Sequence, residues 1–229
     1  MDFGRGLSYI RQAPNWLVKT LLGSVISVVP ILNFASTGYS MDVIRNVYTG
    51  RETPLPEWGE NFGDRWIRGL IAMVIVFIYM LPLAILGCGF ALVGVAGSAP
   101  DIGQAERSAT ESLMLLPFCI APVIFVAALL LGTLALVAQA RFAVTNDVSA
   151  ALRLGSVLAE WRSGLGRWLS VLLMTIAIAI PFGVVGLLTC GLGYLLVFYV
   201  VLAQSHWLAQ AYRETTGARE GADTSAHTW

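Results

Sequence analysis

The side chains most able to do chemistry in this sequence gather near the ends of apolar segments. His206, Gln210 and Arg213 are spaced four and three residues apart, which places them on one face of a helix. Such groups in a membrane could line a conduction path, or His206 could bind a cofactor such as a haem or chlorophyll. We favour a structural role, because all of them lie in the last turns before the water, where polar side chains reach the headgroups and one another. This polar cluster comprises Gln139, Arg141, Gln204, His206, Gln210 and Arg213.

The sequence lacks the residue patterns of a membrane enzyme. It has two histidines, His206 and His227, no HExxH motif, and no aspartate pair or Ser and His pair on adjacent apolar segments. Cys88, Cys119 and Cys190 show neither CxxC nor Cys/His metal spacing, and no GxxxxGKS/T loop is present to cradle a phosphate. We therefore expect no catalytic residue, no metal site and no cofactor.

Composition defines the class of protein. The chain of 229 residues is 57% hydrophobic and 12% charged, whereas about a quarter of the residues in a soluble domain are charged. The formal net charge is zero, which gives no basis for binding nucleic acid. We expect its partners to be the lipid bilayer and other membrane proteins or further copies of this chain.

Long apolar stretches of the sequence predict four membrane crossings. No Lys, Arg, Asp or Glu lies between Arg167 and Arg213, a length of about two crossings, and the glycines of residues 189–193 can reverse the chain between them. Two further crossings are predicted, one from Trp66 to Leu86, ended by Gly87-Cys88-Gly89, and one from Leu113 to Ala140. Residues 100–112 would form the outer loop between these two crossings.

The first apolar segment predicts a hairpin that re-enters the membrane without crossing it. Pro30 and Asn33 interrupt the segment between Trp16 and Arg45, and only about 20 Å of helix fits between Trp16 and Pro30. Both flanks are basic, so a true crossing would put one basic flank outside. The alternative is a tilted crossing kinked at Pro30.

Interfacial elements complete the prediction. Residues 2–12 predict a short amphipathic helix, and Asn146-Asp147 can cap a second one from Val148 to about Trp161, with Ala151, Leu154, Leu158 and Trp161 on its apolar face and Glu160 on its polar face. Tryptophans are typical of the headgroup region, and we expect five of them to act as interfacial anchors: Trp16, Trp58, Trp66, Trp161 and Trp168.

The distribution of basic residues orients the chain. Every basic residue except Arg107 falls on one side of the predicted crossings, and basic flanks are cytoplasmic. We therefore predict an all-α polytopic helical bundle of four crossings, an N-terminal re-entrant or kinked hairpin and inner-interface amphipathic helices, with both termini cytoplasmic. Residues 1–213 would form one membrane domain and residues 214–229 a disordered tail.

Two parts of the sequence echo each other. EWGENFGDRWIRGL and EWRSGLGRWLSVL each precede an apolar segment that contains a proline and then a Gly-flanked cysteine. Duplication and chance both explain this similarity, because Trp, Arg and Gly recur at membrane interfaces.

The order of several motifs resembles a known family. PNW followed by VPILNF, then GYSMDVIRNVYTGRETPLPEW, ARFAVTNDVSAALRLGSVLAEW and LAQAYR resemble the prokaryotic membrane family catalogued as domain of unknown function 4013, over roughly Pro14 to Arg213. The resemblance implies a multipass topology and a prokaryotic origin, and it implies no activity. We expect the protein to lie in the cytoplasmic (inner) membrane. From the residues we expect a non-catalytic accessory or scaffold component of a membrane assembly, or a bilayer-shaping protein; the alternative is a small oligomeric transporter or channel.

Overall fold

The computed structural model describes residues 3–51, 55–97, 104–189 and 197–226, and these ranges are helical, without strands. This confirms the all-α class. The helices are α1 (Phe3–Gln12), α2 (Trp16–Val28), α3 (Asn33–Tyr48), α4 (Phe62–Gly97), α5 (Gln104–Thr145), α6 (Val148–Leu152), α7 (Leu154–Ser163), α8 (Leu165–Leu188) and α9 (Val197–Ala226).

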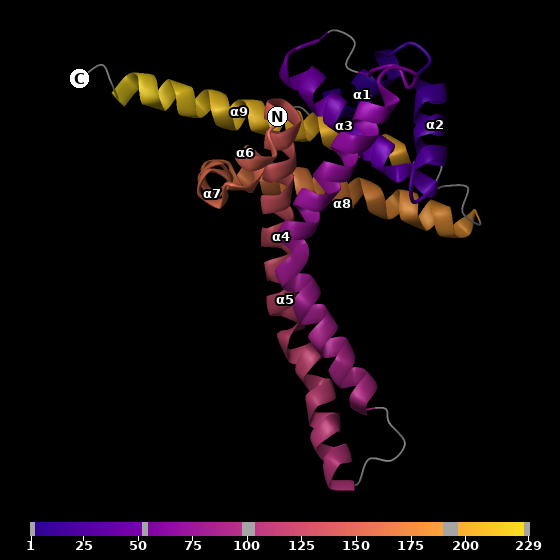
Figure 1. The fold of residues 1–229 in the computed structure, drawn as a ribbon, viewed down its shortest axis with the longest axis vertical. Coiled ribbons are helices and arrows are strands. Elements are labelled where there is room, and N and C mark those ends of the chain that lie inside the picture. The colour runs from indigo at the N-terminus through magenta and orange to yellow at the C-terminus, as the bar shows by residue number, and fades with distance from the viewer. Residues whose placement is uncertain (1–2, 52–54, 98–103, 190–196, 227–229) are drawn as a thin grey trace.

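The molecule has a helical core from which two apolar arms project (Figure 1). Helices α4 and α5 have 36 and 42 residues, and they run side by side as one arm of more than about 50 Å. Helix α8 leaves the core in a different direction from this arm (Figure 1). Helices α1, α2, α3, α6 and α7 gather with part of α9 at the base of both arms, so the core lies at one end of the α4–α5 arm.

Three helices within the described ranges are long and apolar enough to cross a membrane. These stretches are Phe62–Gly89 in α4, Ala121–Thr145 in α5 and Leu165–Leu188 in α8, and they agree with a multipass membrane protein. The fourth predicted crossing, which would end near Tyr212, is not among them. Its first residues and Cys190 lie in 190–196, outside the described residues, so the fourth crossing stays a prediction.

Helix α9 forms the centre of the core instead. It contacts α1, α2, α3, α5, α7 and α8, and four of the largest fully buried side chains belong to it: Phe198, Leu202, Trp207 and Leu208. Ala203, Ala209 and Ala211 are also completely buried, on other faces of the helix. Because these buried residues point in several directions, protein surrounds α9 along this stretch.

The predicted break in the N-terminal segment is confirmed. Helix α2 ends at Val28 and α3 begins at Asn33, and Ser27 of α2 lies 2.5 Å from Ser36 of α3, measured between their hydroxyl oxygens. The indole Nε1 of Trp66 donates to the carbonyl of Ile31 over 2.7 Å, so the tip of the α2–α3 hairpin lies beside the first turns of α4.

Two predicted helix ends are wrong. Helix α4 continues through Gly87-Cys88-Gly89 to Gly97, and α5 already begins at Gln104, within the predicted outer loop. A glycine inside a helix costs only about 1 kcal/mol relative to alanine, which the apolar residues on both sides can offset. Cys88 is exposed on α4 and does not lie in a turn.

The amphipathic helix predicted from Val148 to Trp161 is two helices. Asp147 caps α6 as predicted, accepting a hydrogen bond from the backbone N–H of Ser149 over 2.8 Å, and this bond and one from the Ser149 hydroxyl lower the pKa of Asp147. At Arg153 the backbone leaves helical geometry with ψ at 87°, and α7 starts in a new direction. The predicted faces are therefore wrong: Leu154 is 64% exposed and Glu160 is buried.

The C-terminal part of α9 continues beyond the predicted end of the membrane domain. The helix extends to Ala226, and Thr215 is buried beside Gly164 of the α7–α8 junction. The disorder predicted for residues 214–229 stays a prediction.

The first turns of α4 cross α3 at backbone contact distance. A Cβ atom built on Gly69 would lie 1.7 Å from the carbonyl oxygen of Phe34, and one built on Gly38 would lie 1.9 Å from the carbonyl oxygen of Arg65. Both clashes are with backbone, which cannot rotate away as a side chain does. Glycine at both positions is therefore what permits this crossing.

We predict that Gly69→Ala lowers stability by about 1–3 kcal/mol or more, because the two helices must separate to admit one methyl group. Gly87→Ala on the same helix is the control, since no atom lies within 4 Å of its Cβ position. Thermal unfolding of the detergent-purified protein measures both. Equal stability of the two variants would contradict the close crossing.

Candidate functional site

A polar cavity lies between the α2–α3 hairpin, α5 and α9. Its volume is about 290 Å³, enough for several water molecules at roughly 30 Å³ each. No charged side chain is among the lining residues, which are Ser27, Asn33, Ser36, Thr37, Ser40, Met41, Ile44, Gln139, Val197, Phe198, Val201, Gln204, Ser205 and Leu208. The cavity thus offers hydroxyl and amide groups without a charge.

Backbone carbonyls occupy most of the hydroxyl donors of this cavity. Thr37 donates to the carbonyl of Asn33 over 3.2 Å, Ser40 to that of Thr37 over 2.6 Å, and Ser205 to that of Val201 over 2.8 Å. Gln139 and Gln204 also line the cavity, and no hydrogen bond joins their side chains to another described residue. The arrangement can therefore bind water or an uncharged polar group through these two amides.

The other members of the predicted polar cluster do not join this cavity. His206 is buried and stacks on Tyr9 of α1 with the ring centroids 4.3 Å apart, and its Nε2 lies 3.0 Å from the amide nitrogen of Gln210. Because an amide nitrogen only donates, Nε2 accepts in this contact, and a neutral ring then carries its proton on Nδ1. Arg213 is exposed.

Tyr9 fixes α1 against this part of α9. Its hydroxyl donates to the carbonyl of Leu202 over 3.2 Å, and burial, followed by the nearby Tyr39 and Tyr199, raises the pKa of Tyr9 well above its usual value. The hydroxyl of Tyr199 donates to the carbonyl of Leu7 over 2.7 Å in return. The predicted N-terminal amphipathic helix therefore packs on protein along one face.

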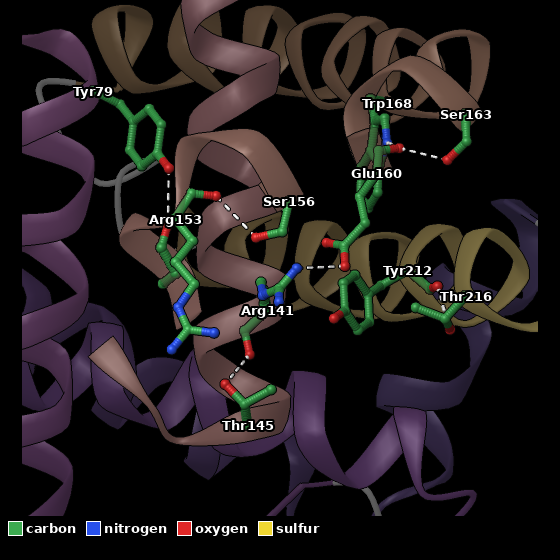
Figure 2. Close-up of polar contacts among 11 residues, drawn as sticks. Tyr79, Arg141, Thr145, Arg153, Ser156, Glu160, Ser163, Trp168, Tyr212 and Thr216 are labelled. Carbon is green, nitrogen blue, oxygen red and sulfur yellow. Dashed lines mark hydrogen bonds and ion pairs between the residues drawn. The ribbon is translucent and has the colours of Figure 1, made fainter. Parts of the chain in front are cut away.

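Arg141, also in the predicted cluster, belongs to a nearly buried ion pair. Its Nη1 lies 2.6 Å from Oε1 of Glu160, and the two side chains are 17% and 9% exposed. Figure 2 shows the pair beside the ring of Tyr212, so that α5, α7 and α9 meet at this point. The Glu160 carbonyl also accepts from Nε1 of Trp168 over 3.4 Å. The pair thus holds the base of α8 to the end of α5.

Two further groups of ion pairs were not predicted from the sequence. Asp42 of α3 accepts from Nε of Arg65 and from Nη1 of Arg68, each over 2.7 Å. Lys19 is 5% exposed, and its Nζ lies 2.7 Å from a carboxylate oxygen of Glu57. All these contacts lie in the core and at the base of the arms, where they fix helices to one another.

Two of these ion pairs lie at equivalent positions of the two similar sequence segments. In each copy the glutamate of a Glu-Trp dipeptide pairs with a basic residue of an earlier helix: Glu57 with Lys19 and Glu160 with Arg141. The tryptophan indole then donates to the same earlier helix, Trp58 to the Lys19 carbonyl over 3.0 Å and Trp161 to the Thr133 hydroxyl over 2.8 Å. The two copies make the same kind of contact.

Two of the five predicted interfacial tryptophans are buried within the protein. Trp168 is 0% and Trp58 is 7% exposed, so protein atoms cover both side chains. Trp16, Trp66 and Trp161 are partly exposed and stay candidates for the headgroup region.

The fold and these contacts define an all-helical multipass membrane protein whose ionisable core groups are paired in its packing. The chain belongs to a family of such chains: the model described as "Protein of unknown function (DUF4013)" matches residues 22–191. The comparisons find no similar curated protein and no similar solved structure.

We predict that Glu160→Gln lowers stability by about 3 kcal/mol, because it leaves the Arg141 guanidinium nearly buried without its counter-charge. Arg141→Met with Glu160→Leu should recover part of the loss, since no charge is then buried. Glu214→Gln is the control: its pair with Arg167 spans 3.3 Å, with side chains 41% and 37% exposed, and such exposed pairs contribute at most about 1 kcal/mol. Denaturation midpoints of the variants in detergent measure these differences, and equal losses for Glu160→Gln and Glu214→Gln would contradict the role of the buried pair.

Proposed function

We propose that the protein is a non-catalytic component of a membrane assembly, in which its core holds two apolar arms for other membrane proteins to bind. This proposal rests on the exposed surface of helix α8. Its buried residues are only Trp168, Val171 and Gly186, and two of these lie near its base. Large apolar side chains of its outer part, among them Ile180, Leu187 and Leu188, stay exposed, so the described residues leave much of its surface uncovered.

Helix α8 also carries a surface suited to another helix. Ala179 is exposed, and Gly183, four residues later, has no described atom within 4 Å of its Cβ position. Small residues spaced by four let two helices approach closely in lipid, where packing drives their association. Large apolar side chains flank this surface, including Ile180 at 61% and Leu187 at 77% exposure. A partner helix would cover both kinds of residue.

The ion pairs support a role without catalysis. Asp42 and Glu160 bind basic side chains of neighbouring helices and are themselves largely covered, so these two carboxylates serve in packing. The proposed location is the inner membrane of a prokaryote with both termini cytoplasmic, which rests on the distribution of basic residues.

We predict that Gly183→Leu weakens the association by at least about fivefold, because loss of close packing costs at least about 1 kcal/mol. Gly87→Leu is the matched control, an exposed glycine of the other arm with equally free space at its Cβ position. The full chain is isolated from native membranes in mild detergent after cross-linking, and the co-isolated proteins are quantified by mass spectrometry. The proposal requires a fixed set of proteins with the wild type and Gly87→Leu, and a reduced yield of the same set with Gly183→Leu.

The polar cavity favours a second candidate function, a small oligomeric transporter or channel for an uncharged solute. Gln139 and Gln204 would bind the solute at the α2–α3 break, since interrupted helices often line transport sites. A pure homo-oligomer in the isolation experiment would overturn the assembly proposal and support this candidate.

A further inference from the structure

A second hollow lies at the arginine-rich end of the α4–α5 arm. Its volume is about 440 Å³, and it opens where the last turns of α3, the first turns of α4 and the junction of α5 with α6 meet. The lining residues are Arg45, Asn61, Asp64, Ile67, Arg68, Ile71, Phe142, Asn146 and Val148. The lining of the hollow thus combines charged and amide side chains with apolar ones.

Basic groups exceed acidic groups around this hollow. Arg45 is exposed and makes no ion pair with any described residue. Arg68 pairs with Asp42 over 2.7 Å but keeps 23% of its side chain exposed, while Arg65 shares the same carboxylate. Three arginines, Arg45, Arg65 and Arg68, therefore stand against two carboxylates, those of Asp42 and Asp64. The net charge of the group is +1. A monovalent anion would neutralise this site.

An apolar ridge continues from the hollow along α4. Ile67, Val74 and Ile78 are 51%, 49% and 44% exposed, and with Ile71 they recur every three or four residues on one face. From Ile67 to Ile78 the ridge is about 16 Å long at 1.5 Å per residue. One leaflet of a bilayer core is about 15 Å thick, so the ridge matches the length of a leaflet.

We propose that this hollow binds a glycerophospholipid from the leaflet at the arginine-rich end. Arg45 and Arg68 hold the phosphodiester through charge-assisted hydrogen bonds, and one acyl chain lies along the ridge of Ile67, Ile71, Val74 and Ile78. Asp64 accepts a hydrogen bond from an amine or hydroxyl of the headgroup. The lipid would thereby join the ends of α3 and α5 to the start of α4.

The ridge and Asp64 favour a lipid over free phosphate. Inorganic phosphate would use only the charged side chains, among which Asp64 repels it, and would leave the apolar side chains without a partner. A phosphodiester carries a single negative charge, which matches the net charge of the site. The inference does not depend on the proposed function, because the contacts would form in a scaffold or in a transporter.

The test measures lipid binding to the full chain purified in detergent and delipidated. Phosphatidylethanolamine, phosphatidylglycerol, diacylglycerol and inorganic phosphate are titrated separately, and native mass spectrometry counts the bound molecules. The variant is Arg45→Gln. Because the Arg45 side chain is exposed, this substitution leaves the core contacts in place. Arg51→Gln is the matched control, an exposed arginine from the same segment that does not line the hollow.

We expect one saturable phospholipid per chain, with an affinity about tenfold lower in Arg45→Gln, as for the loss of one hydrogen bond between charged groups. Arg51→Gln should bind within about twofold of the wild type, and diacylglycerol should not occupy the site. Asp64→Asn should reduce the preference for phosphatidylethanolamine over phosphatidylglycerol. Equal loss in Arg45→Gln and Arg51→Gln, equal binding of diacylglycerol, or saturation by inorganic phosphate alone would each overturn the proposal.

Discussion

Burial of α9 on all of its faces is the constraint on which the rest of the structure depends. Trp207, Leu202 and Ala209 are completely covered, and the helices that cover them come from both ends of the chain. Lipid covers an apolar helix as well as protein does, so a helix becomes central only when specific contacts select protein partners. Here Tyr9 and His206 stack across α1 and α9, and Phe198 packs against Trp58 and Tyr39. These contacts gather the short helices around α9 and leave α8 and the α4–α5 arm to face outward.

Ion pairs and close backbone contacts then set the directions of the arms. The crossing at Gly38 and Gly69, with Asp42 bound to two arginines of α4, fixes the start of α4 on α3. The Arg141 and Glu160 pair fixes α7, and through the Trp168 indole also α8, to the end of α5. Breaking one partner of a nearly buried pair is costly, which makes these junctions rigid. Rigid junctions suit a protein that presents apolar surfaces to partners.

The sequence predicted those features that depend on local chemistry. Pro30 and Asn33 predicted the break between α2 and α3, and Asp147 predicted the start of α6. The uncharged stretches predicted the three long apolar helices. The central position of α9 could not be predicted, because the uncharged length up to Arg213 suits a crossing and the contacts that bury α9 come from helices distant in the sequence. Glu160 was assigned to a polar face because a single helix was assumed, and the break at Arg153 rotates α7 relative to α6. Its pairing with Arg141 then follows from tertiary packing alone.

Labelling from within the lipid tests the central position of α9 most directly. The wild-type protein, purified and reconstituted without other proteins in lipid vesicles, is exposed to a lipid-soluble diazirine, irradiated, and digested for mass spectrometry, so that labels report side chains in contact with hydrocarbon. The account predicts strong labelling of α4 between Ile67 and Ile85 and of α8 between Leu173 and Leu188, where large apolar side chains are exposed, and little labelling of residues 198–212. Labelling of residues 198–212 as strong as that of α8 would make α9 a lipid-facing crossing and would contradict the account.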